Sequence, residues 1–115
     1  MKQEIDFSKI MELLQGSKDL LGRVLEVAVT DWDMQLGLLE KAIQNKDYVE
    51  IRKRVHRIKG AVQNFYYQRL VAKLAEYELA AEAEEKRDWE AFLRSLRDEL
   101  KTLEAEVLKF KNGPA

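Results

Sequence analysis

Apolar residues recur at alternating steps of three and four along nearly the whole chain, which is the spacing of amphipathic α-helices. The pattern predicts five helices, and the first is much shorter than the others. Each of the four longer helices carries an apolar stripe that must be covered by another helix. The expected helices cover about residues 7–15, 18–45, 48–65, 70–83 and 89–110.

Residues that favour helix ends stand between these stripes. Side chains suited to the N-cap position precede three of the long helices, and they are Ser17, Asp47 and Asp88. Gly16 is expected to cap the C-terminus of the short first helix. The second helix is expected to be continuous, because its apolar spacing is uninterrupted across residues 30–33. A bend near Gly37 is allowed. Asn-Gly-Pro at 112–114 is expected to stop the last helix.

The composition narrows the fold class. The 115-residue chain contains one proline, five glycines and no cysteine. So few turn residues argue against a β-sandwich or barrel, and the lack of cysteine excludes disulfides and thiolate metal sites. Short connections between helices favour antiparallel neighbours. We therefore expect an all-α fold, an antiparallel up-down four-helix bundle with a short extra N-terminal helix, in one domain over residues 1–115.

The overall charge and hydropathy argue against several kinds of partner. With 20 basic and 21 acidic residues the formal net charge is −1, which does not point to nucleic acid. No apolar run reaches the roughly 20 residues of a membrane span, and the first residues lack the apolar region of an export signal. We expect a cytoplasmic protein that binds neither membrane nor nucleic acid. Charge is nevertheless uneven, with seven basic and two acidic side chains at 46–69, against one and five at 70–85.

The third helix contains the most informative segment. Residues 52–59 read Arg-Lys-Arg-Val-His-Arg-Ile-Lys and include the only histidine of the chain. With about 100° of rotation per residue, His56 lies roughly 130° from the centre of the apolar stripe, so it is expected to face solvent. Gly60 lies one turn further along that face, although glycine inside a helix costs about 1 kcal/mol relative to alanine. Either a neighbouring helix packs closely there, or something from outside must approach the imidazole.

The residue types around His56 indicate phosphoryl chemistry. Lys59, Gln63 and Arg52 lie on one side of it and could surround an anion with cations and a neutral donor. A neutral imidazole is a competent nucleophile at physiological pH. Positive charge nearby lowers the electrostatic cost of a bound phosphoryl group and of its transfer. The pattern therefore favours a site that holds a phosphoryl group on histidine.

Residues 56–61, His-Arg-Ile-Lys-Gly-Ala, resemble the H-x-x-K-G-[S/A] motif of histidine-containing phosphotransfer (HPt) domains. The resemblance covers nearly the whole chain, with a Leu/Ala helix ending before Asp47, Arg-Leu at 69–70, a Leu/Ala/Glu-rich helix, and Asp88 before the last helix. It implies a helical bundle that carries phosphoryl groups between the aspartates of response-regulator receiver domains in a multistep phosphorelay. The chain has no nucleotide-binding motif, so we expect a phosphocarrier without kinase activity of its own.

The resemblance also implies roles for single residues. His56 would be the phospho-acceptor, Lys59 the stabilising cation, Gly60 the clearance for the receiver, and Gln63 a hydrogen-bonding partner of the phosphate. The residues expected to contact the partner are Arg52, Lys53, Arg57 and Tyr67. The implied partners are receiver domains and a hybrid sensor histidine kinase, and the chain is expected to be a monomer. It should need no cofactor, because in the family magnesium belongs to the receiver.

Two positions depart from the family pattern. Tyr66 stands where the family usually has glycine near the end of this helix, which leaves the geometry of the helix exit in question. Val62 replaces a small residue, and its spacing assigns it to the core. Neither change affects His56, Lys59 or Gly60.

Two other interpretations remain open at the level of sequence. A basic patch around His56 could bind a nucleic-acid backbone, although the patch is only one or two turns long; retention on heparin would test this. The chain could also be an HPt-like adaptor that binds a regulator without transferring phosphate. An adaptor should keep its function when His56 is replaced by glutamine.

Overall fold

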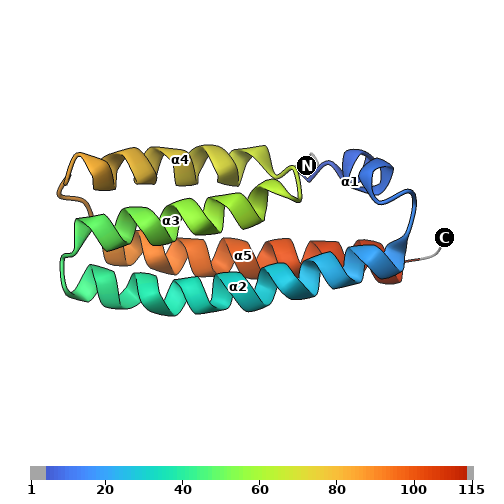
Figure 1. The fold of residues 1–115 in the computed structure, drawn as a ribbon, viewed down its shortest axis with the longest axis horizontal. Coiled ribbons are helices and arrows are strands. Elements are labelled where there is room, and N and C mark those ends of the chain that lie inside the picture. The colour runs from blue at the N-terminus through green and yellow to red at the C-terminus, as the bar shows by residue number, and fades with distance from the viewer. Residues whose placement is uncertain (1–4, 114–115) are drawn as a thin grey trace.

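The computed structural model describes residues 5–113, which form five α-helices joined by short connections (Figure 1). Their bounds lie within a few residues of those expected from the apolar spacing. The helices are α1 (Phe7–Leu13), α2 (Lys18–Gln44), α3 (Tyr48–Gln63), α4 (Gln68–Glu82) and α5 (Trp89–Asn112). The second helix is continuous, as expected, and Pro114 lies outside the described residues.

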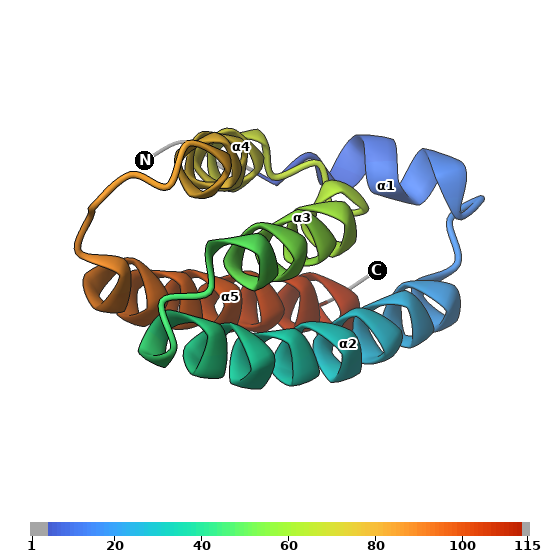
Figure 2. The same cartoon turned by 60° about the vertical axis from the view of Figure 1, so that its left-hand side comes forward.

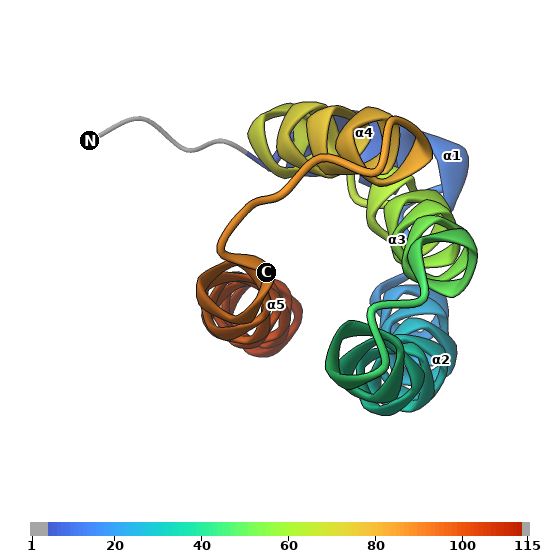
Figure 3. The same cartoon turned by 90° about the vertical axis from the view of Figure 1, so that its left-hand side faces the viewer.

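Helices α2 to α5 run in alternating directions and form an antiparallel four-helix bundle (Figure 1). Seen from one end, α4 packs against α3, α3 against α2, and α2 against α5, while α4 and α5 stand farther apart (Figure 3). The short α1 lies beyond the end of α3 (Figure 2). It is anchored by a β-bridge between Ile5 and Tyr67 and by Phe7, which stacks on Phe110 at 4.3 Å between ring centroids. The expected fold class, an all-α up-down bundle with a short extra helix, is confirmed.

The core consists of the apolar stripes that the sequence predicts. Val55, Ile58 and Val62 of α3 are fully buried, and each such aliphatic side chain stabilises the fold by about 1.5–3 kcal/mol. The assignment of Val62 to the core is therefore confirmed. On α2 the buried surface is wider than the predicted stripe, because Ala28, Ala42 and the polar Gln35 are buried too. Gln35 accepts a hydrogen bond from Arg54 at 2.8 Å, which satisfies this buried amide oxygen.

The three expected N-caps are formed by side-chain oxygens. Ser17 accepts from the backbone N–H of Leu20, Asp47 from that of Glu50, and Asp88 from that of Ala91, at 3.1, 3.2 and 2.9 Å. Each bond satisfies an N–H that has no partner inside the helix. Asp6 caps α1 in the same way, at 3.0 Å from the N–H of Lys9.

The helix C-termini use left-handed residues that are mostly not glycine. At the end of α1 the first left-handed residue is Gln15, with φ of 54°, and Gly16 follows with φ of 77°, so the expected cap is displaced by one residue. Lys46 and Glu84 take the same position after α2 and α4, both with φ of 53°. A left-handed conformation costs an ordinary L-residue roughly 1–2 kcal/mol. These ends therefore contain strain that glycine would relieve.

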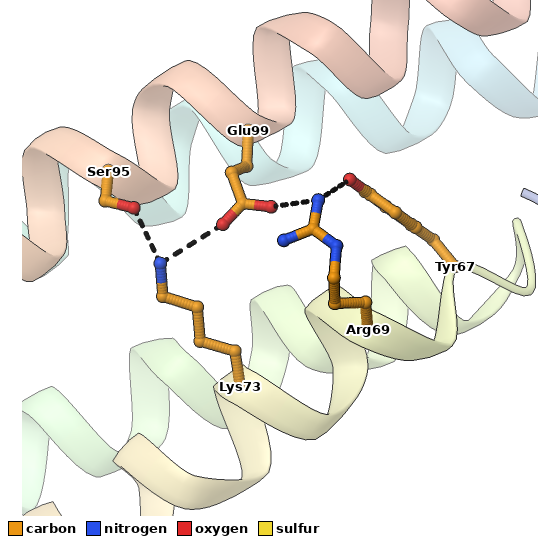
Figure 4. A network of polar contacts seen from close by, with 5 residues as sticks. All are labelled: Tyr67, Arg69, Lys73, Ser95 and Glu99. Atoms are coloured by element: carbon orange, nitrogen blue, oxygen red, sulfur yellow. Dashed lines mark hydrogen bonds and ion pairs between the residues drawn. The ribbon is translucent and has the colours of Figure 1, made fainter. Parts of the chain in front are cut away.

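Side chains close the wider gap between α4 and α5 (Figure 4). Lys73 of α4 donates to Ser95 and Glu99 of α5 at 2.6 and 3.1 Å, and Arg69 lies 3.0 Å from Glu99 while also contacting the hydroxyl of Tyr67. At the other end of the gap, aromatic rings meet: Tyr77 stacks on Phe92 at 4.0 Å between centroids, and Trp89 packs edge-on against both. These contacts hold α4 against α5.

Candidate functional site

The candidate site lies midway along α3, on the face that points away from the core. Burial of Val55, Ile58 and Val62 turns the opposite side of the helix to solvent, and the His56 side chain is 64% exposed. The predicted exposure of His56 is confirmed. Its ring is thus accessible to a partner while its backbone is held within a rigid helix whose inner face is fully buried.

One carboxylate from α4 joins the two central residues of the site. Glu78 Oε2 lies 2.9 Å from His56 Nδ1, and Glu78 Oε1 lies 2.7 Å from Lys59 Nζ. Glu78 is largely buried, with 16% of its side chain exposed, and Lys59 is half-buried beside it. The histidine and the lysine are therefore positioned by the same group, which lies 22 residues after His56 in sequence.

The charge of Glu78 follows from these contacts. Burial acts to raise the pKa of Glu78, but the hydrogen bonds from Lys59 and His56 outweigh it, so that the pKa is lowered from its ordinary value. Glu78 is therefore ionised near neutral pH. The sequence alone does not identify Glu78, because the acidic residues of this helix look like a solvated face and no local spacing tells which of them reaches α3.

Gly60 is not required by packing within the chain. It is exposed, and a Cβ placed on it would meet no atom within 4 Å apart from its own helix neighbourhood. Of the two explanations left open by the sequence, close packing of a neighbouring helix is therefore ruled out. Gln63 is also exposed, about two turns after His56 on the same side of α3.

Gly60 and His56 border a groove between α2 and α3, which we call the α2–α3 groove. Apolar side chains from α2 form much of its floor. The groove is lined by Arg23, Val24, Val27, Ala28, Asp31, His56, Arg57, Gly60, Ala61 and Asn64.

Exposed apolar residues continue from this groove along α2. We call this set the apolar α2 stripe: Leu20, Val27, Met34 and Leu38. Val27 and Met34 are 72% and 60% exposed, so the stripe is not used in packing among the described residues. The sequence alone does not single out this stripe, although its residues recur at steps of seven and four alongside the core stripe.

Acidic neighbours compensate much of the positive charge predicted around His56. Arg57 pairs with Asp31 of α2 at 3.0 Å, Lys53 lies 3.6 Å from Glu50, and Lys59 pairs with Glu78 as described. Arg52 is half-buried on the same helix. The site is therefore a set of ion pairs around an exposed imidazole, and not the uncompensated basic patch that the sequence of α3 alone indicates.

The two tyrosines after α3 pack in or against the core, and neither is a free surface residue. Tyr67 is buried, with 5% exposure, so it does not lie on the exposed face where the sequence-based prediction placed it as a partner contact. Its ring packs into the core at the start of α4. Tyr66 has φ of 51°, the left-handed conformation that favours glycine, and its half-buried ring packs on the core. The helix exit thus makes the turn expected of glycine, with tyrosine in its place.

Metal sites and membrane spans are both missing from the part of the chain that the structure describes. Within residues 5–113, no group of three or more His, Asp or Glu side chains is arranged to hold a metal ion. None of the helices in this range is long and apolar enough to cross a bilayer.

The fold is an up-down four-helix bundle, and its site has an exposed mid-helix histidine followed by a lysine three residues later and a glycine four residues later. These features define a class of histidine-bearing helical domains. Comparison with protein families agrees: the family model of the Hpt domain matches residues 23–106, which include His56, Lys59, Gly60 and Glu78. The chain belongs to the Hpt domain family, whose members act in histidine phosphotransfer in two-component systems. Neither curated proteins nor solved structures gave a significant match.

Proposed function

We propose that this chain is a phosphocarrier in which His56 accepts a phosphoryl group from the aspartate of one receiver domain and passes it to the aspartate of another. The observation that carries the proposal is the exposed His56 imidazole, with Lys59 beside it and no side chain at Gly60. Membership of the Hpt domain family supports it. A hybrid sensor histidine kinase would supply the first receiver.

The chemistry requires a nucleophile and charge compensation. The imidazole attacks the phosphorus of the aspartyl phosphate, a P–N bond forms, and the P–O bond to the aspartate breaks with release of the carboxylate. Lys59 Nζ lies near the ring through their shared partner Glu78, so it can turn toward the incoming phosphoryl group. Magnesium would be held by the receiver, and the carrier itself would bind no metal and no ATP.

The receiver would dock over the α2–α3 groove. The absence of a side chain at Gly60 lets a partner approach the imidazole, and Val24 and Val27 offer apolar contact beside it. Arg52, Lys53 and Arg57 would meet acidic groups around the partner's phosphorylation site, and Gln63 would lie at the edge of the contact. Since one carrier molecule presents a complete site, we propose that it acts as a monomer.

Transfer from phosphorylated receivers tests the proposal. The chain is incubated with a panel of radiolabelled phospho-receivers and magnesium, with His56→Gln as the control. We expect acid-labile, alkali-stable label on the wild type and none on the variant, with circular dichroism spectra that are the same for both. Binding of a receiver without transfer would overturn the carrier proposal in favour of an adaptor. Retention on heparin with no receiver bound would favour a nucleic-acid role.

A further inference from the structure

An ion pair joins α2 to α3 directly beside His56. Arg57 Nη2 donates to Asp31 Oδ1 at 3.0 Å, across 26 positions in sequence. Both residues line the α2–α3 groove, together with His56 and Gly60. The two helices lie side by side there (Figure 3). Because Arg57 follows His56 in the chain, the pair fixes a cation at the edge of the surface over which a partner would reach the imidazole.

The two members of this pair differ in exposure. The side chain of Asp31 is 24% exposed, whereas that of Arg57 is 63% exposed. A guanidinium has five N–H donors in a planar fork, and Asp31 uses one terminal nitrogen of Arg57. Within residues 5–113, Asp31 is the acidic partner that the structure gives to Arg57. Arg57 can therefore bind a second carboxylate, from a partner protein, without releasing the first.

Stability gives little reason for this ion pair. Exposed ion pairs contribute little to folding, because water and salt screen them and two long side chains lose conformational freedom. The pair has a larger effect on binding, because a side chain that is ordered in advance does not have to be ordered when a partner docks. A fixed cation also attracts a partner with an acidic side chain and repels one with a basic side chain.

We propose that Asp31 is a positioning residue that holds Arg57 beside His56, and that the positioned guanidinium selects receiver domains with an acidic side chain at the facing position. This inference rests on the proposed function and names the chemistry of the partner that the site accepts. Asp31 acts through Arg57, and Arg57 acts on docking. A receiver with a basic side chain at the facing position would be both a poor donor and a poor acceptor.

An exchange of charge between the two proteins tests the choice of partner. The receiver is the one that labels the wild type fastest, and each acidic residue that borders its phosphorylation site, outside its magnesium ligands, is replaced by lysine in turn. For one such replacement, we expect kcat/KM for uptake by the wild-type carrier to fall by about tenfold or more. Arg57→Glu should recover uptake from that receiver variant and lose uptake from the natural receiver. The inference is overturned if Arg57→Glu rescues none of the replacements.

Asp31→Asn tests the positioning role. Each rate of uptake from the receiver is divided by the rate with phosphoramidate, a small donor that labels His56 without docking. We expect this ratio to fall about three- to tenfold in Asp31→Asn, through a higher KM. In the Arg57→Gln background the same replacement should have no effect, because no guanidinium remains to be positioned. Glu40→Gln is the matched control, because Glu40 of α2 pairs with Arg97 of α5 at 2.9 Å and does not line the α2–α3 groove.

The opposite results are distinct from one another. A ratio that rises in Asp31→Asn would mean that Asp31 competes with the receiver for Arg57, and it would overturn the inference. An equal loss in Glu40→Gln would also overturn it, because the effect would then belong to interhelical ion pairs in general. The proposed function fails separately, if no receiver labels the wild type. The same exchange of charge, measured as receiver binding in a titration, then decides the role of Arg57, and a complete lack of receiver binding overturns both proposals.

Discussion

Replacing Gly60 by glutamine should make the protein more stable and a much poorer carrier. Gly60 lies inside α3, where a Cβ would meet no atom of the chain within 4 Å. Glycine in an exposed helix interior is less favourable than alanine by about 1 kcal/mol and less favourable than glutamine by about 0.5 kcal/mol. Gly60→Gln should therefore raise the free energy of unfolding by about 0.5 kcal/mol, and Gly60→Ala by up to about 1 kcal/mol.

The rate of phosphoryl transfer should fall in Gly60→Gln, although the free energy of unfolding rises. The new side chain would lie one turn from His56 on the same face, between the imidazole and an approaching receiver. A displacement of about 1 Å between reacting groups can cost about 100-fold in rate, so we expect a loss of that order for Gly60→Gln and a smaller loss for Gly60→Ala. Urea unfolding gives the stability, and the rate of label transfer from a phospho-receiver gives the function.

Gly37 provides the matched control. It is also exposed inside a helix, and a Cβ added there would meet no atom within 4 Å, but Gly37 does not line the α2–α3 groove. Gly37→Gln should gain the same stability and leave transfer unchanged. The clearance role of Gly60 is wrong if Gly60→Gln transfers at the wild-type rate, or if both glutamine variants lose transfer equally.

Three further predictions concern strain, docking and pH. Lys46→Gly should stabilise the protein by about 0.5–1 kcal/mol in urea unfolding, because it relieves a φ of 53°, whereas Lys41→Gly within α2 should destabilise it by a similar amount. Val27→Glu should weaken receiver binding about tenfold in a titration, while Leu13→Glu on α1, at a residue 65% exposed, should not. Burial raises the pKa of Glu78, but Lys59 and His56 outweigh it and lower this pKa on folding, so ionised Glu78 stabilises the fold fully above its ordinary pKa of 4.5. This stabilisation is lost as pH falls through the lowered pKa. Between about pH 5 and 3, the free energy of unfolding should therefore decline less in Glu78→Gln than in the wild type.

The helices and their N-caps could be predicted because both depend on residues close in sequence. Ser17, Asp47 and Asp88 each cap an N–H three residues later, and a three-to-four spacing identifies the buried face. The C-terminal ends were less predictable. Gln15, Lys46 and Glu84 adopt left-handed conformations without the glycine that usually marks them, since the surrounding helices fix the chain path.

The site was only partly predictable, for a related reason. The exposure of His56 follows from the rotation of one helix, so its own sequence is sufficient. The pairing of His56 and Lys59 with Glu78 depends on the register of α4 against α3, which arises from tertiary packing of Leu70, Leu74 and Ala81. Tyr67 could not be placed from the sequence for the same reason. Its position next to the motif predicted a solvent-exposed partner contact, but the β-bridge with Ile5 and its place at the start of α4 bury it.

The ion pairs around His56 also bear on what a carrier requires. Free cations at Lys59 and Arg57 would bind a phosphoryl group strongly and make its release to the next aspartate unfavourable. With Glu78 and Asp31 as partners, these cations can turn toward the phosphoryl group only by giving up an ion pair, which offsets part of the gain. The difference in free energy between the empty and the loaded carrier is thereby reduced. In the proposed carrier, a site of this kind would favour passage of the phosphoryl group over its storage, as transfer between two aspartates would require.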